Sequence, residues 1–141
     1  MRFLVLSSFL LLTSVLAASS WEDWLWVVAQ RTQGIPYRYG GSDPRTGMDC
    51  SAFVRWVYKY AGISLPRTSR EQMAASRLIR EYVPGALLFF SSSGRQVDHV
   101  GIYLGRGYML HASGAHGKVV VEPVRHYTHI LVAIGWPVFR R

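Results

Sequence analysis

GMDCSAFVRWVYKYAG, residues 47–62, is the stretch that decides the fold this sequence predicts. A glycine-rich, turn-prone segment ends at Met48, and apolar residues then recur every three or four positions, the spacing of a helix with one buried face. The expected apolar stripe consists of Phe53, Trp56, Val57 and Tyr60, widened by Val54 and Ala61. We therefore expect a buried helix against which the rest of the chain packs.

Cys50, the only cysteine in the chain, falls in the first turn of this helix. Asp49 is a suitable N-cap residue, and Gly62 is well placed to end the helix. Free N–H groups and the helix dipole stabilise a thiolate there and, with a nearby imidazolium, can lower a thiol pKa from ~8.5 to roughly 3.5–7.5. We expect a nucleophilic cysteine; the alternative is a small buried apolar residue, the usual role of a lone cysteine.

The N-terminus has the pattern of an export signal. Arg2 precedes an apolar run over residues 3–16, and small residues suited to cleavage follow. The run is shorter than the ~20 residues that a membrane-spanning helix needs, so an uncleaved anchor is the less favoured alternative. We expect a signal peptide over residues 1–18 and a single domain over residues 19–141. The protein is then exported to the periplasm, cell envelope or medium, without stable membrane insertion.

Charge and cysteine content narrow the classes of partner. The chain has 141 residues and a formal net charge of +8. One cysteine cannot form an intramolecular disulfide, so a free thiol in an oxidising compartment is best explained by its chemistry. Anionic envelope polymers fit the charge of an exported protein better than nucleic acid does, since aromatic and basic residues do not alternate. We expect a monomer without a nucleic-acid partner.

Helices come first along the chain and strands follow. Residues 21–31 indicate an amphipathic helix, residues 33–44 a loop, and the capping-box pair Thr68 and Glu71 the start of a short helix that runs to about Leu78. The strand candidates are residues 86–90, 99–104, 108–111, 118–122 and 130–135. This order predicts an α+β fold in which helices pack on a small antiparallel meander.

Two histidines can meet on this sheet. If residues 105–107 form a three-residue hairpin loop, His99 and His111 share one face, with Cα atoms roughly 7–8 Å apart. A two-residue loop would place them on opposite faces. Cys50, His99 and His111 would then serve as nucleophile, general base and acid, and orienting residue. Backbone N–H groups at the helix start would face the oxyanion of a tetrahedral intermediate.

Zinc binding is the alternative for the same three residues, since cysteine and histidine are ordinary zinc ligands. A cysteine at a helix start is more typical of nucleophilic catalysis, so we expect neither a metal nor a cofactor. The other histidines are His116, in a glycine-rich turn, and His126 and His129, before the last strand candidate. We interpret all three as solvated side chains.

Four motifs, taken together, resemble the NlpC-type cell-wall peptidases, a papain-like family of cysteine endopeptidases. They are GIPYRYGG (34–41), GMDCSAFV (47–54), LPRTSREQ (65–72) and HVGIYLG (99–105) with the following HAS (111–113). The resemblance implies a helix-start cysteine packed on a small antiparallel sheet that carries the histidines. It also implies hydrolysis of peptidoglycan stem peptides, typically between D-γ-glutamate and a diamino acid such as meso-diaminopimelate. By position, Cys50 matches the nucleophile, His99 the base and His111 the third polar residue.

The resemblance also suggests residues around the nucleophile. Tyr37 matches a tyrosine beside the nucleophile, where its hydroxyl could assist the oxyanion or the substrate. Asp49, Ser51 and Arg67 are candidate substrate contacts, although we prefer Asp49 as the helix cap. Two other functions stay open: a thiol-dependent acyltransferase or amidase acting on an envelope substrate, and a wall-binding module without catalysis.

Overall fold

The computed structural model describes residues 21–138 of the chain. The expected signal peptide, residues 1–18, lies outside the described residues. Within the part of the chain that the structure describes, none of the helices combines the length and apolarity needed to cross a membrane.

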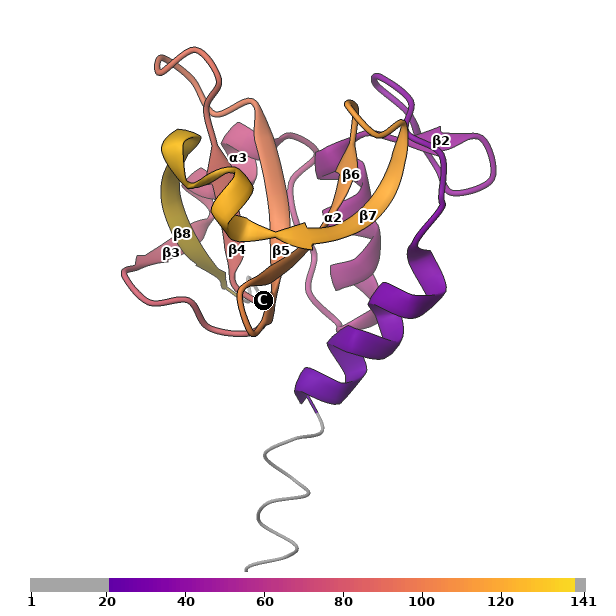
Figure 1. Cartoon of the computed structure of the whole chain (residues 1–141), viewed down its shortest axis with the longest axis horizontal. Coiled ribbons are helices and arrows are strands. Elements are labelled where there is room, and N and C mark those ends of the chain that lie inside the picture. Colours follow the sequence, from indigo (N-terminus) through magenta and orange to yellow (C-terminus); the bar gives the residue numbers. More distant parts are fainter. Residues whose placement is uncertain (1–20, 139–141) are drawn as a thin grey trace, which may run out of the picture.

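The α-helices precede the strands of the large sheet, and the predicted α+β fold is confirmed (Figure 1). A helix over residues 21–32 comes first, as expected. The elements that follow are β1 (Ser42–Asp43), β2 (Gly47–Met48), α2 (Cys50–Tyr60), α3 (Ser69–Ala74), β3 (Ser76–Ile79), β4 (Leu87–Phe90), β5 (His99–Gly105), β6 (Tyr108–Ser113), β7 (Lys118–Pro123), the 3₁₀ turns η1 (Val124–His126) and η2 (Thr128–Ile130), and β8 (Leu131–Pro137).

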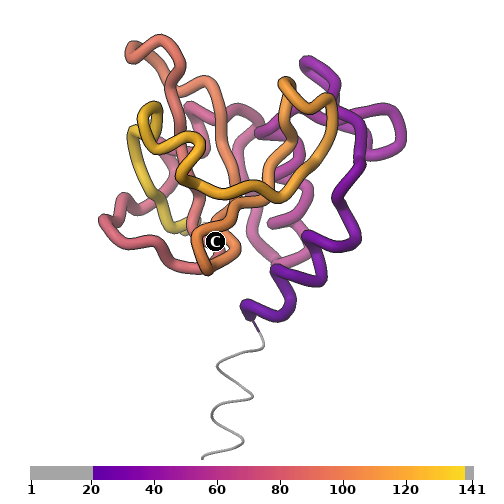
Figure 2. The backbone as a smooth tube through the Cα atoms, in the orientation of Figure 1, coloured from indigo at the N-terminus to yellow at the C-terminus, as the bar shows by residue number. Residues whose placement is uncertain are grey.

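One six-stranded antiparallel sheet organises the fold, with strand order β3-β8-β4-β5-β6-β7. Strands β4 to β7 form the expected meander, but β8 does not extend it. After η1 and η2 the chain returns and pairs with the other side of β4. The loop over residues 34–37 runs beside β7, where the N–H of Gly34 donates to the carbonyl of Val119 at 2.9 Å (Figure 2).

Helix α2 packs against strands β5 and β6 of the sheet. Its boundaries are the predicted ones. The Asp49 carboxylate accepts the N–H of Ala52 at 2.8 Å, and Gly62 follows the helix with a φ of 77°. The N–H of Ile63 closes the end by donating to the carbonyl of Tyr58 at 3.0 Å, the bond that satisfies a terminal helix carbonyl.

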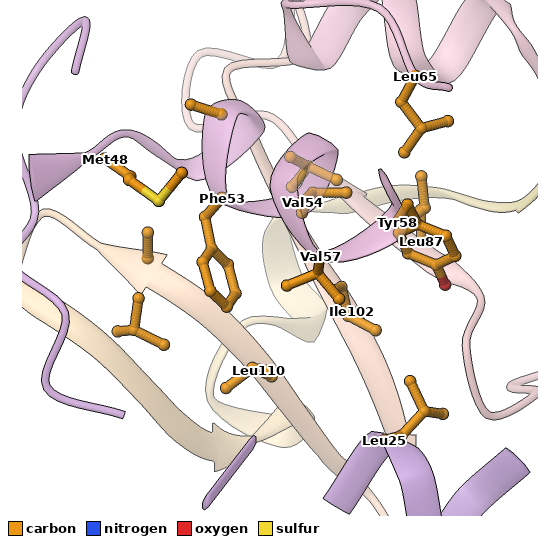
Figure 3. Packing of buried hydrophobic residues seen from close by; sticks show 14 of the residues in the cluster. Leu25, Met48, Phe53, Val54, Val57, Tyr58, Leu65, Leu87, Ile102 and Leu110 are labelled. Atoms are coloured by element: carbon orange, nitrogen blue, oxygen red, sulfur yellow. The ribbon is translucent and has the colours of Figure 1, made fainter. Parts of the chain in front are cut away.

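The buried face of α2 differs from the expected stripe, because Trp56 is only partly buried and Tyr58 takes the place of Tyr60. Tyr58 is 1% exposed, whereas Tyr60, which we expected inside, is 72% exposed. Figure 3 shows Phe53, Val54, Val57 and Tyr58 on the inner side of the helix, with Ile102 and Leu110 of the sheet below them. The buried face therefore includes Val54 and Tyr58. Tyr58 can be buried because its hydroxyl donates to the buried carbonyl of Gly85.

The second helix is shorter than predicted. α3 begins at the expected cap, where the Glu71 N–H donates to Thr68 Oγ1 at 3.2 Å, but it ends at Ala74 rather than near Leu78. Ser76 Oγ donates to the carbonyl of Gln72 at 2.8 Å and so satisfies one free carbonyl of the last turn. Residues 76–79 then pair with β8, a partner that lies far along the sequence.

Candidate active site

Cys50 is the first residue of α2 and is partly exposed. Burial raises the pKa of its thiol, and the Asp49 carboxylate adds to this, while the backbone N–H groups of Val100, Ser51 and Cys50 itself lower it. The net direction is upward, so the lowered thiol pKa expected from the helix start is wrong. The N–H groups act as expected, but removal of the sulfur from water outweighs them. In the resting site the sulfur is therefore a thiol, placed beside Val100, the residue after His99.

Asp49, Ser51 and Arg67 form one polar network around the first turn of α2. The Arg67 guanidinium binds both carboxylate oxygens of Asp49, with Nη1–Oδ1 at 2.9 Å and Nη2–Oδ2 at 2.8 Å. Arg67 Nη1 also donates to Ser51 Oγ at 3.0 Å. Asp49 is the helix cap, as preferred from the sequence. The three side chains bind one another, and their contact with substrate stays a prediction.

His99 and His111 lie together, as the sequence predicted. His99 Nε2 and His111 Nδ1 are 2.7 Å apart, a hydrogen bond between the two rings. The His111 side chain is 1% exposed, and His99, at the start of β5, is half-buried and packs against the ring of Phe90. The ring of His99 is therefore held from two sides.

The hairpin that aligns the histidines has the expected register but a different turn. Tyr103 pairs with Met109, as required for the two imidazoles to share a face. Gly105 pairs with Tyr108, so the turn contains only residues 106–107, both with positive φ, rather than the three residues we expected. A β-bulge between Tyr103 and Gly105 inserts the residue that the shorter turn removes, and this restores the face.

Both imidazoles are neutral at neutral pH. Burial, with a smaller contribution from the neighbouring His111, lowers the pKa of His99 to about 3. Burial also lowers the pKa of His111, although Glu122 opposes this. A neutral imidazole can accept a proton, so His99 is in the form that a general base requires. The resting pair is thiol and imidazole, not the thiolate and imidazolium considered from the sequence.

The Tyr37 phenol lies within electrostatic range of Cys50 and Asp49. The backbone N–H of Tyr37 donates to the carbonyl of Gly117 at 2.9 Å, and the residue bridges to Met48 on its other side. Burial raises the pKa of the Tyr37 phenol, and the nearby Cys50 and Asp49 add to this. The hydroxyl therefore keeps its proton and is available as a donor near the sulfur.

Glu122 is a site residue that the sequence interpretation missed. Its Oε1 lies 2.7 Å from His111 Nε2 and accepts the hydroxyl of Tyr127 at 2.8 Å. His116 and His126, which we interpreted as solvated, both approach its Oε2, at 3.3 Å and 3.7 Å. Their rings are half exposed, but both lie close to one buried carboxylate.

A sequence signal for Glu122 exists. It is the one acidic residue in an apolar strand, and in the observed pairing Met109 faces Glu122 while His111 faces Val120. Because side chains alternate, Glu122 and His111 share a face. Pairing the two strands through the turn at residues 114–117 would have revealed this.

The zinc alternative requires several ligands around one point. Among residues 21–138, no group of three or more histidine, cysteine, aspartate or glutamate side chains is arranged to hold a metal ion.

Proteins of similar sequence are known. A model described as the NlpC/P60 family matches residues 34–133. The chain is 45% identical over 89 residues to the bifunctional muramidase/DL-endopeptidase CwlT of Bacillus subtilis, covering 60% of this chain and 27% of CwlT. It is 45% identical over 106 residues to the murein DD-endopeptidase MepH of Escherichia coli, covering 67% of this chain and 39% of MepH. The chain thus spans less than half the length of these relatives.

The fold has solved counterparts. An NlpC/P60 family protein from Bacillus cereus superposes with a TM-score of 0.75 at 30% sequence identity, covering 82% of this chain and 40% of the other. The α+β, papain-like class predicted from the sequence is therefore confirmed, with a helix-start cysteine packed on an antiparallel sheet.

Proposed function

The chain belongs to the NlpC/P60 family, and from this membership we propose that it is a cysteine endopeptidase that hydrolyses peptide bonds in peptidoglycan. The observation that carries the proposal is the juxtaposition at the start of α2. The Cys50 thiol accepts the backbone N–H of Val100 in β5, the residue that follows His99, and His99 is hydrogen-bonded to a second, buried histidine. Both named relatives carry endopeptidase in their names, which supports the reaction class.

The protonation states of the site suggest the order of events. Because the thiol is neutral and the His99 imidazole is free, Cys50 Sγ attacks the substrate carbonyl carbon as its proton passes to His99. In this proposal the N–H groups at the start of α2 and the Tyr37 hydroxyl stabilise the oxyanion. His99 then gives the proton to the leaving amine, and a thioester remains on Cys50.

Water completes the cycle by the same path. His99 takes a proton from water as the oxygen attacks the thioester carbon, and the second tetrahedral intermediate expels the sulfur. The proton returns from His99 to the sulfur, and the products are a carboxylic acid and the regenerated thiol. His111 keeps the His99 ring in place throughout, since its hydrogen bond occupies the other ring nitrogen.

The proposal also specifies which peptide bond is cleaved. We propose cleavage between D-γ-glutamate and the diamino acid of the stem peptide, in an exported, monomeric protein of the cell envelope. The name of CwlT specifies a DL-endopeptidase and that of MepH a DD-endopeptidase, so relatives of similar identity differ in the bond they are named for. The net charge of +8 suits an anionic wall polymer.

Digestion of purified peptidoglycan tests the proposal. Wild type and Cys50→Ala are incubated with the polymer, and soluble products are identified by mass. We expect fragments cut at the γ-glutamyl bond from wild type only, with a loss of at least ~10³-fold in the variant because the nucleophile is absent. Equal product from both proteins would remove Cys50 as the nucleophile. Fragments cut at another stem-peptide bond would retain the enzyme class and overturn the assigned bond.

A further inference from the structure

The Glu122 side chain has four polar neighbours, although the proposed mechanism gives it no role. Its side chain is only 11% exposed. Oε1 faces His111 Nε2 at 2.7 Å and accepts from Tyr127 Oη at 2.8 Å, while His116 Nε2 and His126 Nδ1 lie 3.3 Å and 3.7 Å from Oε2. A buried carboxylate with four partners is costly to build unless its charge or geometry has a use.

The hydrogen bonds that Glu122 accepts determine where the protons of the two histidines lie. A carboxylate can only accept, so His111 Nε2 must carry a hydrogen. A neutral His111 then has its lone pair on Nδ1, and at 2.7 Å from His99 Nε2 this nitrogen must accept. His99 Nε2 therefore carries a hydrogen too. A neutral His99 is left with its lone pair on Nδ1.

We infer that Glu122 is a positioning residue, which sets the tautomers of His111 and His99 in series so that His99 presents an unprotonated Nδ1 as the base for Cys50. The inference rests on the proposed cysteine mechanism. Glu122 touches neither the thiol nor the substrate. It acts through His111. By accepting from His111 Nε2, it sets the direction of that hydrogen bond and of the one between His111 and His99.

The opposite arrangement shows why the direction matters. If His111 were protonated, its Nδ1 would donate to His99 Nε2, and the neutral His99 would carry its hydrogen on Nδ1. The nitrogen that remains for the thiol would then have no lone pair. Burial lowers the pKa of His111 and so disfavours this state.

The surroundings keep the carboxylate ionised and aligned. Burial alone would raise the pKa of Glu122, but hydrogen bonds from Tyr127 and His111 outweigh it, and the pKa lies below its ordinary value. Burial and the adjacent carboxylate raise the pKa of Tyr127 to about 12, so its hydroxyl stays a donor. Tyr127 and His111 share Oε1, while His116 and His126 face Oε2.

Nitrogen-15 NMR of the wild-type protein tests the tautomers without any substitution at Glu122. The five histidines are assigned from His116→Asn, His126→Asn and His129→Asn variants together with the remaining two signals. We expect both His99 and His111 to show a protonated Nε2 and an unprotonated Nδ1 at pH 7. A protonated Nδ1 on either ring would overturn the inference. This measurement needs no substrate, so it also separates the inference from the proposed function.

A matched pair of variants tests the consequence for catalysis. Glu122→Gln keeps a carbonyl that can accept from His111 and Tyr127, whereas Glu122→Leu has a similar size and no acceptor. We expect Glu122→Leu to lose ~10²-fold in kcat and Glu122→Gln less than ~10-fold, at the low end of what general acid–base catalysis contributes. KM should stay within about twofold in both, since substrate binding is not altered.

The pH 7 rate of Cys50 alkylation by iodoacetamide provides a second readout that does not depend on peptidoglycan. It should be slower in Glu122→Leu than in Glu122→Gln and wild type. Equal kcat and equal alkylation rates for the two variants would overturn the positioning role. If wild type shows the expected tautomers and alkylation but releases no stem peptides, the proposed substrate fails and the inference stands.

Discussion

The two sides of the candidate site are built from different kinds of contact. The thiol side is held by neighbours in sequence and one arginine; its members are Asp49, Cys50, Ser51 and Arg67. The histidine side is held by the register of three strands; its members are His99 on β5, His111 on β6 and Glu122 on β7.

This difference predicts how each side fails. A helix start with a local cap tolerates damage gradually, because each hydrogen bond contributes about 0.5–1.5 kcal/mol net, more where a charge is involved. A strand slip of one residue moves every side chain to the other face, so the histidine side is either assembled or lost. We expect substitutions on the thiol side to lower stability first and substitutions on the histidine side to lower activity first.

Acid should have the largest effect on the histidine side. The pKa of His99 in the folded protein is about 3, below its ordinary value, so between that value and ~6.5 the unfolded chain binds the proton first. Stability is complete above ~6.5 and is lost as the pH falls, at up to about 1.4 kcal/mol per pH unit. Urea unfolding at pH 7 and pH 5 should show a loss of ~2 kcal/mol in wild type.

The matched controls are His99→Gln and His129→Gln. His129 is exposed in η2, so its replacement should leave the pH dependence of the unfolding free energy as in wild type. Replacement of His99 should make that dependence shallower. If both variants follow the wild-type curve, His99 does not contribute to acid sensitivity and the contrast between the two sides weakens.

The thiol side was the more predictable of the two. The cap at Asp49, the stop at Gly62 and the cap at Thr68 were all read from adjacent residues, because the groups that satisfy a helix end lie within a few positions of it. The ion pair between Arg67 and Asp49 was not predicted, because the two residues lie eighteen positions apart in sequence.

The histidine side was predictable only as far as one hairpin reaches. The register of β5 and β6 was correct although its turn was not, since a bulge compensated for the missing loop residue. Glu122 required a third strand to be aligned as well. The prediction that residues 76–78 continue the second helix was wrong for the same reason. These residues form a strand because they pair with β8, a partner that local propensity does not identify.

Replacement of Arg67 on the thiol side should have an intermediate effect on stability. Arg67→Met removes the bonds to both Asp49 oxygens and to Ser51 but keeps the apolar stem. We expect the free energy of unfolding in urea to fall by about 1–2 kcal/mol, a figure reduced for the partial exposure of the arginine. Arg70→Met, at an exposed position of α3, should change it by less than ~0.5 kcal/mol. Equal stabilities would mean that the network does not hold the helix start.

Gly101→Ala should have the smallest effect on stability and still reduce activity. A Cβ at Gly101 would lie 3.3 Å from the Cβ of His111 and 3.2 Å from the sulfur of Met109. The methionine can move, but His111 must shift by a few tenths of an ångström against its bond to His99. We expect unfolding to change by less than ~1 kcal/mol while kcat falls ~10-fold, because proton transfer depends on that alignment.

Gly114→Ala is the matched control for that shift, since its Cβ would meet the ring of Tyr37 at an ordinary 3.5 Å and neither glycine has a positive φ. Unfolding and the nitrogen-15 signals of His99 and His111 are measured for both variants. Only Gly101→Ala should move the two histidine signals, because only its methyl presses on the His111 ring attachment. If Gly101→Ala instead lowers stability by several kcal/mol with kcat per folded molecule unchanged, the histidine side fails through packing, as the thiol side does, and the distinction between them is removed.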